Sequence, residues 1–166
     1  MNSPICLVGM RGSGKTVVGR ELSQELGWQF ADLDEALTKK EGKTIAQIFQ
    51  DEGEAFFRNQ ESILLREYLE KTLPLVIATG GGIVLKKENR ELLKNKAKVV
   101  WLDTPPELLA RRIPAPDPNR PGLTQLSWAE EMAHLCQERR PWYQEVANCR
   151  IENQDQPLAQ LVGAIL

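Results

Sequence analysis

Residues 9–16 read Gly-Met-Arg-Gly-Ser-Gly-Lys-Thr and fit the pattern G-x-x-x-x-G-K-[ST]. In that pattern the glycines let the backbone curl so that successive N–H groups point at phosphate oxygens, and the positive end of the following helix adds to the attraction. Lys15 would reach the outer phosphates, and the Thr16 hydroxyl would ligate Mg²⁺. An apolar run precedes the motif and a helical pattern follows it, as the chemistry requires. The sequence therefore predicts a site that binds the phosphates of ATP together with Mg²⁺.

Two carboxylates, Asp32 and Asp34, lie at the end of a second strand-like run, over residues 29–33. Because side chains alternate along a strand, we expect both carboxylates on the same side, at the sheet edge where the phosphates bind. One would then serve Mg²⁺ while the other accepts a proton from an attacking hydroxyl. The alternative is that one of them merely caps the helix that follows.

Two further groups of residues are candidates for the acceptor-binding site. Arg58 and Glu61 are three residues apart in a helical stretch, so they share a face and Glu61 would orient the guanidinium. The alternative for this pair is an ordinary surface ion pair. The three glycines of residues 80–82 follow a buried strand and would allow a ligand to approach the backbone closely, unless they form a plain tight turn.

Arg139 and Arg140 precede Pro141 inside a long helical pattern, where a proline costs about 3 kcal/mol. Such a cost suggests that this part of the helix positions one of the two arginines. A planar guanidinium matches a carboxylate in a bidentate manner. Arg58 and one of this pair, converging on a single pocket, predict an anionic acceptor, because a neutral one would leave two buried cations unpaired.

Strand-like runs alternate with helical patterns along the whole chain. Such alternation predicts an α/β fold, with a parallel, five-stranded central sheet between two layers of helices and ligands beyond the C-terminal strand ends. We expect one domain over residues 1–166. The expected strands span residues 4–8, 29–33, 75–79, 98–102 and 149–151; the expected helices span residues 14–26, 34–72 with breaks near 42–44 and 53, a stretch from 104, 127–146 and 157–166.

Composition excludes several classes of function. The chain has 166 residues and a formal net charge of −2, which disfavours a general nucleic-acid binder. No apolar run approaches the roughly 20 residues that span a membrane, and no secretory segment is recognisable at the N-terminus. The three cysteines form no metal or disulfide pattern, so we expect buried side chains and a cytoplasmic location. His134, the single histidine, lacks ligand partners and is expected at or near the surface.

Taken together, the motifs resemble those of the shikimate kinase family over essentially the whole chain. Only the P-loop is specific by itself, but the order and spacing of the set separate this family from gluconate kinases and nucleoside monophosphate kinases, which share the P-loop and the fold. The matching motifs are the P-loop, Asp-Leu-Asp at 32–34, Gly-Glu-x-x-Phe-Arg-x-x-Glu at 53–61, Thr-Gly-Gly-Gly at 79–82, Arg-Pro-x-Leu at 120–123 and Arg-x-Pro-x-Tyr at 139–143.

The resemblance implies a role for each matching residue on the acceptor side. Asp34 would contact the acceptor hydroxyls and act as the base, and Arg58 and Arg139 would bind the shikimate carboxylate. The resemblance assigns acceptor binding to the segment over residues 34–62. It also implies that the pocket for the shikimate ring is lined by Gly80, Gly81 and Gly82.

On the nucleotide side, the resemblance implies that Thr16 and Asp32 serve Mg²⁺, the aspartate through water. Arg120 would reach the transferring phosphate from a lid loop over residues 113–125, which is unusually rich in proline. Arg112 would stack on adenine opposite the C-terminal segment. The implied ATP-binding residues are Gly12, Ser13, Gly14, Lys15, Thr16, Val17, Arg112, Arg120, Gln156 and Pro157.

The activity implied is transfer of the γ-phosphoryl group of ATP to the 3-hydroxyl of shikimate, within aromatic amino acid biosynthesis. It implies ATP and shikimate as partners, Mg²⁺ as cofactor, a nucleoside monophosphate kinase-like fold, a monomer, and neither nucleic acid nor membrane as a partner. Two alternatives stand beside it, a kinase for another hydroxy acid such as gluconate and an ATP-binding module without turnover. The second would predict loss of the base or of the arginines, and none is missing.

Overall fold

The computed structural model describes residues 2–113 and 127–166. Over these residues the strands form one parallel sheet in the order β2-β3-β1-β4-β5, with β1 at its centre. The predicted five-stranded parallel sheet is therefore confirmed. The strands are β1 (Ile5–Val8), β2 (Gln29–Asp32), β3 (Leu75–Ala78), β4 (Lys98–Asp103) and β5 (Cys149–Glu152).

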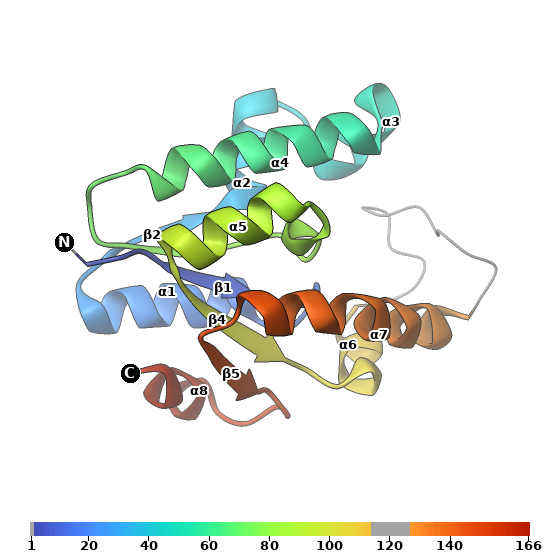
Figure 1. The fold of residues 1–166 in the computed structure, drawn as a ribbon. Coiled ribbons are helices and arrows are strands. Elements are labelled where there is room, and N and C mark those ends of the chain that lie inside the picture. The colour runs from blue at the N-terminus through green and yellow to red at the C-terminus, as the bar shows by residue number, and fades with distance from the viewer. Residues whose placement is uncertain (1, 114–126) are drawn as a thin grey trace.

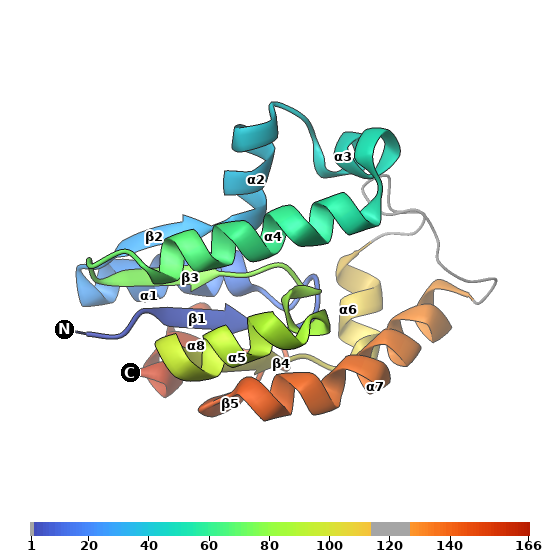
Figure 2. The ribbon, with the colours of Figure 1, turned by 45° about the horizontal axis from the view of Figure 1, so that its top comes forward.

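Helices cover both faces of the sheet, which gives the predicted three layers (Figures 1 and 2). Helices α1 and α8 pack on one face, and α4, α5 and α7 pack on the other. In the described residues, no helix is long and apolar enough to cross a bilayer. The helices are α1 (Lys15–Leu26), α2 (Leu33–Glu41), α3 (Ile45–Glu52), α4 (Glu54–Leu69), α5 (Lys87–Lys96), α6 (Pro106–Arg112), α7 (Trp128–Val146) and α8 (Leu158–Ile165), with a short 3₁₀ turn η1 (Ile83–Leu85).

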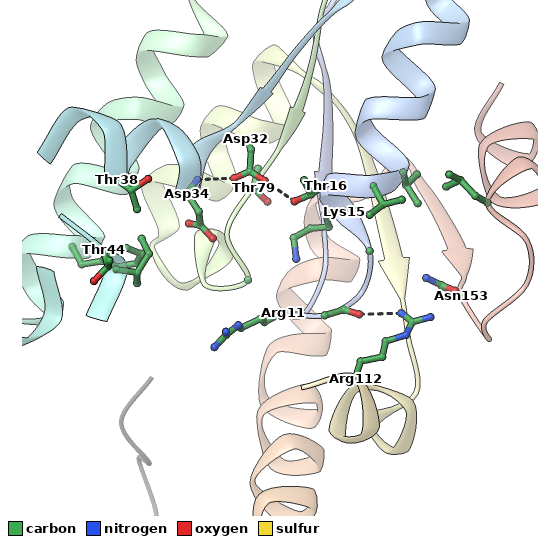
Figure 3. Close-up of a pocket in the computed structure, with 18 of the residues that line it drawn as sticks. Arg11, Lys15, Thr16, Asp32, Asp34, Thr38, Thr44, Thr79, Arg112 and Asn153 are labelled. Atoms are coloured by element: carbon green, nitrogen blue, oxygen red, sulfur yellow. Dashed lines mark hydrogen bonds between the residues drawn. The ribbon is translucent and has the colours of Figure 1, made fainter. Parts of the chain in front are cut away.

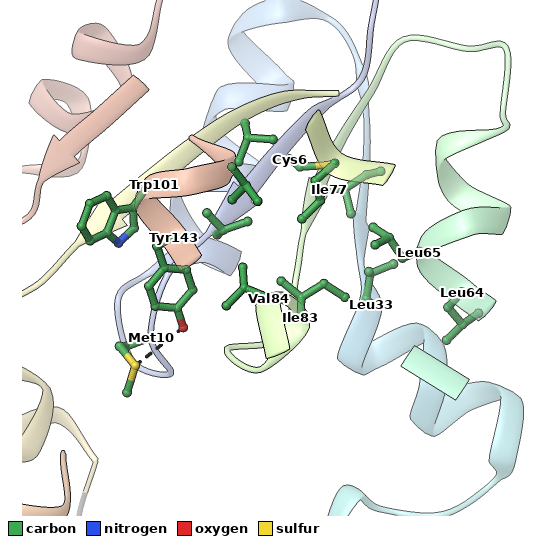
Figure 4. Close-up of a cluster of buried hydrophobic side chains, with 14 of the residues drawn as sticks. Cys6, Met10, Leu33, Leu64, Leu65, Ile77, Ile83, Val84, Trp101 and Tyr143 are labelled. Carbon is green, nitrogen blue, oxygen red and sulfur yellow. Dashed lines mark hydrogen bonds between the residues drawn. The ribbon is translucent and has the colours of Figure 1, made fainter. Parts of the chain in front are cut away.

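The two cores follow from the alternation of side chains along the strands. In β1, Cys6 and Val8 point into the core beneath α4, α5 and α7, whereas Leu7 points into the core beneath α1 and α8. Figure 4 shows the larger core, in which Cys6 and Ile77 lie among aliphatic side chains from η1 and α4. Because both faces of the central strands are covered, β3 is buried at every residue.

The two predicted helix breaks are confirmed at Gly42 and Gly53, whose φ angles are 66° and 85°. Helix α5 was not predicted. Its sequence, Lys-Glu-Asn-Arg-Glu-Leu-Leu-Lys-Asn-Lys, has only two apolar residues, so the helical period is weak. Helix α7 runs through Pro141 from the capping Ser127, as predicted.

The acidic pair is placed differently from the prediction. Strand β2 ends at Asp32, whose side chain accepts hydrogen bonds from Asp34 N at 2.9 Å and Glu35 N at 3.2 Å. Asp32 is thus the N-cap of α2, and Asp34 lies in the first turn of that helix. The strand-alternation argument for the two carboxylates was wrong, because the capping bonds end the strand before Asp34.

The cysteines are only partly as expected. Cys6 is buried, and burial raises the pKa of its thiol to about 12. Cys136 is half-buried, and burial raises its pKa to about 11. Cys149 is exposed, because it begins the edge strand β5, so the expectation of burial was wrong for this residue. His134 is exposed, as expected.

Two glycines inside helices provide a matched test of the packing. A methyl group on Gly19 of α1 would lie 2.7 Å from Phe30 Cε2 and 3.2 Å from Leu7 Cδ1, whereas one on Gly163 of α8 would meet no described atom within 4 Å. We expect Gly19→Ala to lower the free energy of unfolding by about 1–3 kcal/mol through overpacking. Gly163→Ala should raise it by about 0.5–1 kcal/mol. Urea denaturation measures both, and a Gly19→Ala variant as stable as Gly163→Ala would contradict the packing of α1 on β2.

Candidate active site

The loop between β1 and α1 has the backbone that the glycine-rich motif predicts. Gly9, Gly12 and Gly14 have φ angles of 148°, 81° and 89°, which other residues rarely adopt. Lys15 is buried, and its Nζ donates hydrogen bonds of 2.8 Å to the carbonyl oxygens of Gly9 and Met10. The lysine thereby holds the loop curled around its ammonium group.

A cavity of about 1000 Å³ opens beside this loop, at the C-terminal ends of the strands. Figure 3 shows Lys15 and Thr16 in the middle of it, Asp34 on one side and Arg112 with Asn153 on the other. The cavity gathers predicted residues from both the nucleotide and the acceptor sets. Those that line it are Gly12, Gly14, Lys15, Thr16, Val17, Asp32, Asp34, Gly81, Arg112 and Gln156.

Asp32 caps the following helix, which was one of the two alternatives, and its second oxygen contacts the other residue predicted to serve Mg²⁺. One carboxylate oxygen caps α2, and the other accepts a hydrogen bond of 2.5 Å from Thr16 Oγ1. The described residues contain no group of three or more His, Cys, Asp or Glu side chains that would hold a metal by themselves. A hydroxyl and a carboxylate beside a phosphate-binding loop instead suit Mg²⁺, which takes its remaining ligands from phosphate and water.

Arg58, one of the residues predicted to bind the acceptor, is not a surface residue. Arg58 is 8% exposed and Glu61 is 2% exposed, and Nη1 of the arginine donates to Glu61 Oε2 at 3.0 Å. Glu54 lies 3.5 Å from Arg58 Nε. The alternative of an ordinary exposed ion pair is therefore wrong for this pair. Glu61 orients the Arg58 guanidinium through this hydrogen bond, as predicted.

The glycines at 80–82 are required for space rather than for an unusual φ, since none of the three has a positive φ. A methyl group on Gly82 would overlap the guanidinium of Arg58. On Gly80 it would lie 2.5 Å from Glu61 Oε1 and 3.1 Å from Asp34 Oδ1. The turn thus lets three charged side chains approach the backbone at one place.

Arg139 approaches the same turn from α7. It is 3% exposed, and within residues 2–113 and 127–166 its Nε and Nη1 have no hydrogen-bond partner. Its neighbour Arg140 points outward instead, 3.1 Å from Asp103 Oδ2, which settles which arginine of the pair faces inward. A buried guanidinium with unused donors is costly unless an anion completes it, so this geometry suits a carboxylate.

Gly81 connects the acceptor side to the phosphate loop. A methyl group on it would lie 3.5 Å from Arg139 Nη1 and 3.6 Å from Gly9 O. Gly9 O is also the acceptor for Lys15 Nζ. Gly81, which lines the cavity with Lys15, therefore lies between Arg139 and the carbonyl that holds Lys15, although Arg139 itself does not line the cavity.

Sequence reasoning left Arg11 open between contact with the acceptor or lid and exposure to solvent, and it assigned no role to Tyr143. Arg11 lines the cavity; burial lowers the pKa of its guanidinium, and the nearby Asp34 carboxylate partly offsets this. Tyr143 donates a hydrogen bond of 2.5 Å to Gly81 O and stacks on Trp101 with ring centroids 5.9 Å apart. Figure 4 shows its hydroxyl pointing toward Met10 of the loop. The signal for Tyr143 was present in the Arg-x-Pro-x-Tyr motif.

The far end of the cavity holds Arg112 and Gln156. Arg112 Nη1 donates to Gly12 O at 2.9 Å, and its Nη2 pairs with Asp155 at 2.8 Å. Arg120, with the rest of the expected lid from residue 114 onward, lies outside the described residues. The predicted residues that do not line the cavity are Ser13, Arg58, Gly80, Gly82, Arg139 and Pro157.

The chain is similar to known proteins over nearly its whole length. The family model described as shikimate kinase matches residues 11–166. A shikimate kinase of Bordetella avium is 42% identical over 163 residues, which cover 98% of this chain and 77% of that protein. The chain belongs to the shikimate kinase family.

Solved structures of the shikimate kinase family superimpose well on this chain. The shikimate kinase from Acinetobacter baumannii in complex with shikimate matches with a TM-score of 0.92 and 41% identity, covering 99% of this chain and 91% of that one. A gluconokinase from Sinorhizobium meliloti matches with a TM-score of 0.58 and 21% identity, covering 99% and 89%. The second likeness shows only a shared fold.

The contact between Gly82 and Arg58 can be tested by a double-mutant cycle. We expect Gly82→Ala to lower the free energy of unfolding by about 2 kcal/mol, because the methyl group displaces the guanidinium. In an Arg58→Ala background the three atoms nearest to that methyl group are removed, so the cost should fall below about 1 kcal/mol. Urea denaturation of the four proteins gives the coupling. Equal costs in the two backgrounds would show that Arg58 does not lie against Gly82.

Proposed function

We propose that this protein is a shikimate kinase, which transfers the γ-phosphoryl group of ATP to the 3-hydroxyl of shikimate and yields shikimate 3-phosphate and ADP. The observation that carries the proposal is the pair of buried guanidinium groups, Arg58 and Arg139, at a glycine turn that borders the phosphate loop. The relative from A. baumannii, solved with shikimate, supports the choice of acceptor.

The acceptor would bind by its carboxylate. Arg58 is braced by Glu61, and Arg139 has donors to spare, so together they offer two cations to one anion. Of the three glycines, Gly81 lines the cavity and would lie beside the ring. Asp34 stands near this turn and near Arg11, where it would accept the hydrogen bond of the attacking hydroxyl and take its proton.

The nucleotide would bind with its phosphates in the loop and its base toward Arg112 and Gln156. Thr16, and Asp32 through water, would hold Mg²⁺, which would supply positive charge next to the phosphates. Lys15 would add to that neutralisation, which is most of what phosphoryl transfer requires of a protein. The contribution of Arg120 from the lid remains a prediction, as do the monomeric state and the cytoplasmic location.

A kinase for gluconate is the competing proposal, because such kinases share the fold. A coupled ADP-release assay across hydroxy acids separates the two. We expect turnover with shikimate and at least about 100-fold lower kcat/KM with gluconate, because a site that fixes one acceptor by paired charges rejects a poorly fitting one. Turnover only with gluconate, or with none of the acids, would overturn the proposal.

The two inward arginines and the outward Arg140 allow a controlled test of acceptor binding. Arg58→Ala or Arg139→Ala should raise the KM for shikimate by about 10- to 100-fold, since each removes a charge-assisted interaction. The KM for ATP should change by less than about twofold, as neither arginine lies on the loop. Arg140→Ala, exposed on the same helix, should leave both constants near their original values. A rise in both KM values for Arg139→Ala would contradict the assignment.

The two functions of Asp32 can be separated by two substitutions. Asp32→Asn keeps a good N-cap for α2 but removes the charge, so stability should change by less than about 0.5 kcal/mol. Its activity should need a much higher Mg²⁺ concentration. Asp32→Ala removes the cap as well and should cost about 1 kcal/mol of stability. Titration of kcat against Mg²⁺, with thermal unfolding, checks both. An unchanged Mg²⁺ requirement in Asp32→Asn would exclude Asp32 from metal binding.

A further inference from the structure

Two consecutive carbonyl groups of the phosphate-binding loop are held by side chains from distant parts of the chain. Gly12 O accepts from Arg112 Nη1, and Ser13 O accepts from Asn153 Nδ2, each at 2.9 Å. Arg112 ends α6, and Asn153 directly follows β5. The conformation of the loop therefore depends on two segments that meet it only in the folded protein.

Asn153 is built firmly into this position. It is 2% exposed and lines the cavity, and both ends of its amide are used. While Nδ2 donates to Ser13 O, Oδ1 accepts from Asp155 N at 3.2 Å. The Asp155 carboxylate in turn pairs with Arg112. Arg112, Asp155 and Asn153 thus form a connected network that ends on the two loop carbonyls. Figure 3 shows Arg112 and Asn153 on the same side of the cavity.

The bond to Ser13 O defines the direction of a backbone donor. In a planar trans peptide the carbonyl and the following N–H point to opposite sides. Holding Ser13 O against Asn153 therefore turns Gly14 N–H away from Asn153. Gly14 is the N-cap of α1 with a φ of 89°, and N–H groups at such a helix start bind phosphate oxygens. Without a Cβ, Gly14 does little by itself to keep this peptide from rotating.

We propose that Asn153 is a positioning residue that keeps the Ser13–Gly14 peptide turned so that its N–H faces the nucleotide phosphates. The proposal rests on the proposed ATP site. Loss of the Asn153 donor leaves Ser13 O without its partner and frees the peptide to rotate. The consequence must appear in phosphate binding, and not in the binding of the adenine base or of the acceptor.

Asn153→Leu tests this, because it removes both hydrogen bonds and keeps the number and branching of the side-chain heavy atoms. Calorimetry with Mg²⁺ gives the dissociation constants of ATP, tripolyphosphate and adenosine. We expect ATP and tripolyphosphate to bind about tenfold more weakly, the effect of one lost hydrogen bond, and adenosine to be unchanged. Unchanged tripolyphosphate binding would overturn the proposal. So would an equal loss for adenosine and ATP, which would place the role of Asn153 at the base.

Asn148 supplies the matched control. It lies just before β5, and its Oδ1 accepts from Val99 N at 2.7 Å, away from the cavity. Asn148→Leu should lower the melting temperature and leave tripolyphosphate binding unchanged. If it weakens that binding as much as Asn153→Leu does, the effect is general destabilisation and the proposal fails.

Asn153→Asp keeps the shape of the side chain and serves if the leucine variant does not fold. It retains the acceptor for Asp155 N but places a carboxylate oxygen against Ser13 O, so tripolyphosphate should bind at least about tenfold more weakly. Affinity equal to that of the original protein would overturn the proposal. None of these measurements needs turnover. A protein that binds ATP but does not phosphorylate shikimate would therefore refute the proposed function and leave this comparison intact.

Discussion

The predicted acceptor site depends on one constraint: two guanidinium groups are buried against the glycine turn of residues 80–82, where any larger side chain would collide with neighbouring groups. Arg58 and Arg139 come from helices on the same face of the sheet, and both reach the glycine turn after β3. A cation buried with unused donors is unfavourable by itself. Glu61 offsets the cost for Arg58. For Arg139 we expect the carboxylate of the acceptor to offset this cost by accepting hydrogen bonds from its unused donors.

The parallel sheet explains why these groups meet the phosphates. The loop after β1, the cap after β2 and the turn after β3 lie at one edge of the sheet, because parallel strands present their C-terminal ends together. Asp32 then couples two of these connections, since one oxygen caps α2 and the other holds Thr16. Tyr143 couples a third by its bond to Gly81 O. These hydrogen bonds join the loop after β1 to the cap after β2, and the turn after β3 to α7.

Local patterns in the sequence predicted the elements and the phosphate loop well, because the signals for both are local. Strand runs, helix breaks at glycine and the glycine-rich motif act within a few residues. Two predictions of local structure were wrong. Strand β2 ends at Asp32 because this residue caps α2, and helix α5 was missed because it has too few apolar residues to show a helical period. Arg139 faces the protein interior and Arg140 faces outward because of the way α7 packs on the sheet. The residues next to them in the sequence do not indicate which of the two faces inward.

Tertiary contacts explain what the sequence could not predict about the site. Arg58 and Glu61 have the spacing of a common surface pair, and only the glycine turn packed against them makes the pair a buried one. Asn153 belongs to no recognisable motif, and its partner Ser13 lies 140 positions away. The family resemblance carried residue roles that spacing alone left open, such as the assignment of Arg139.

We expect the buried guanidinium groups of Arg58 and Arg139 to recognise the acceptor through its carboxylate. Calorimetric titration of the protein with shikimate and with its uncharged methyl ester tests this most directly, since the two compounds share the ring and the hydroxyls. We expect the ester to bind at least about 100-fold more weakly, because it cannot pair with either guanidinium. Equal affinity for the acid and the ester would contradict it.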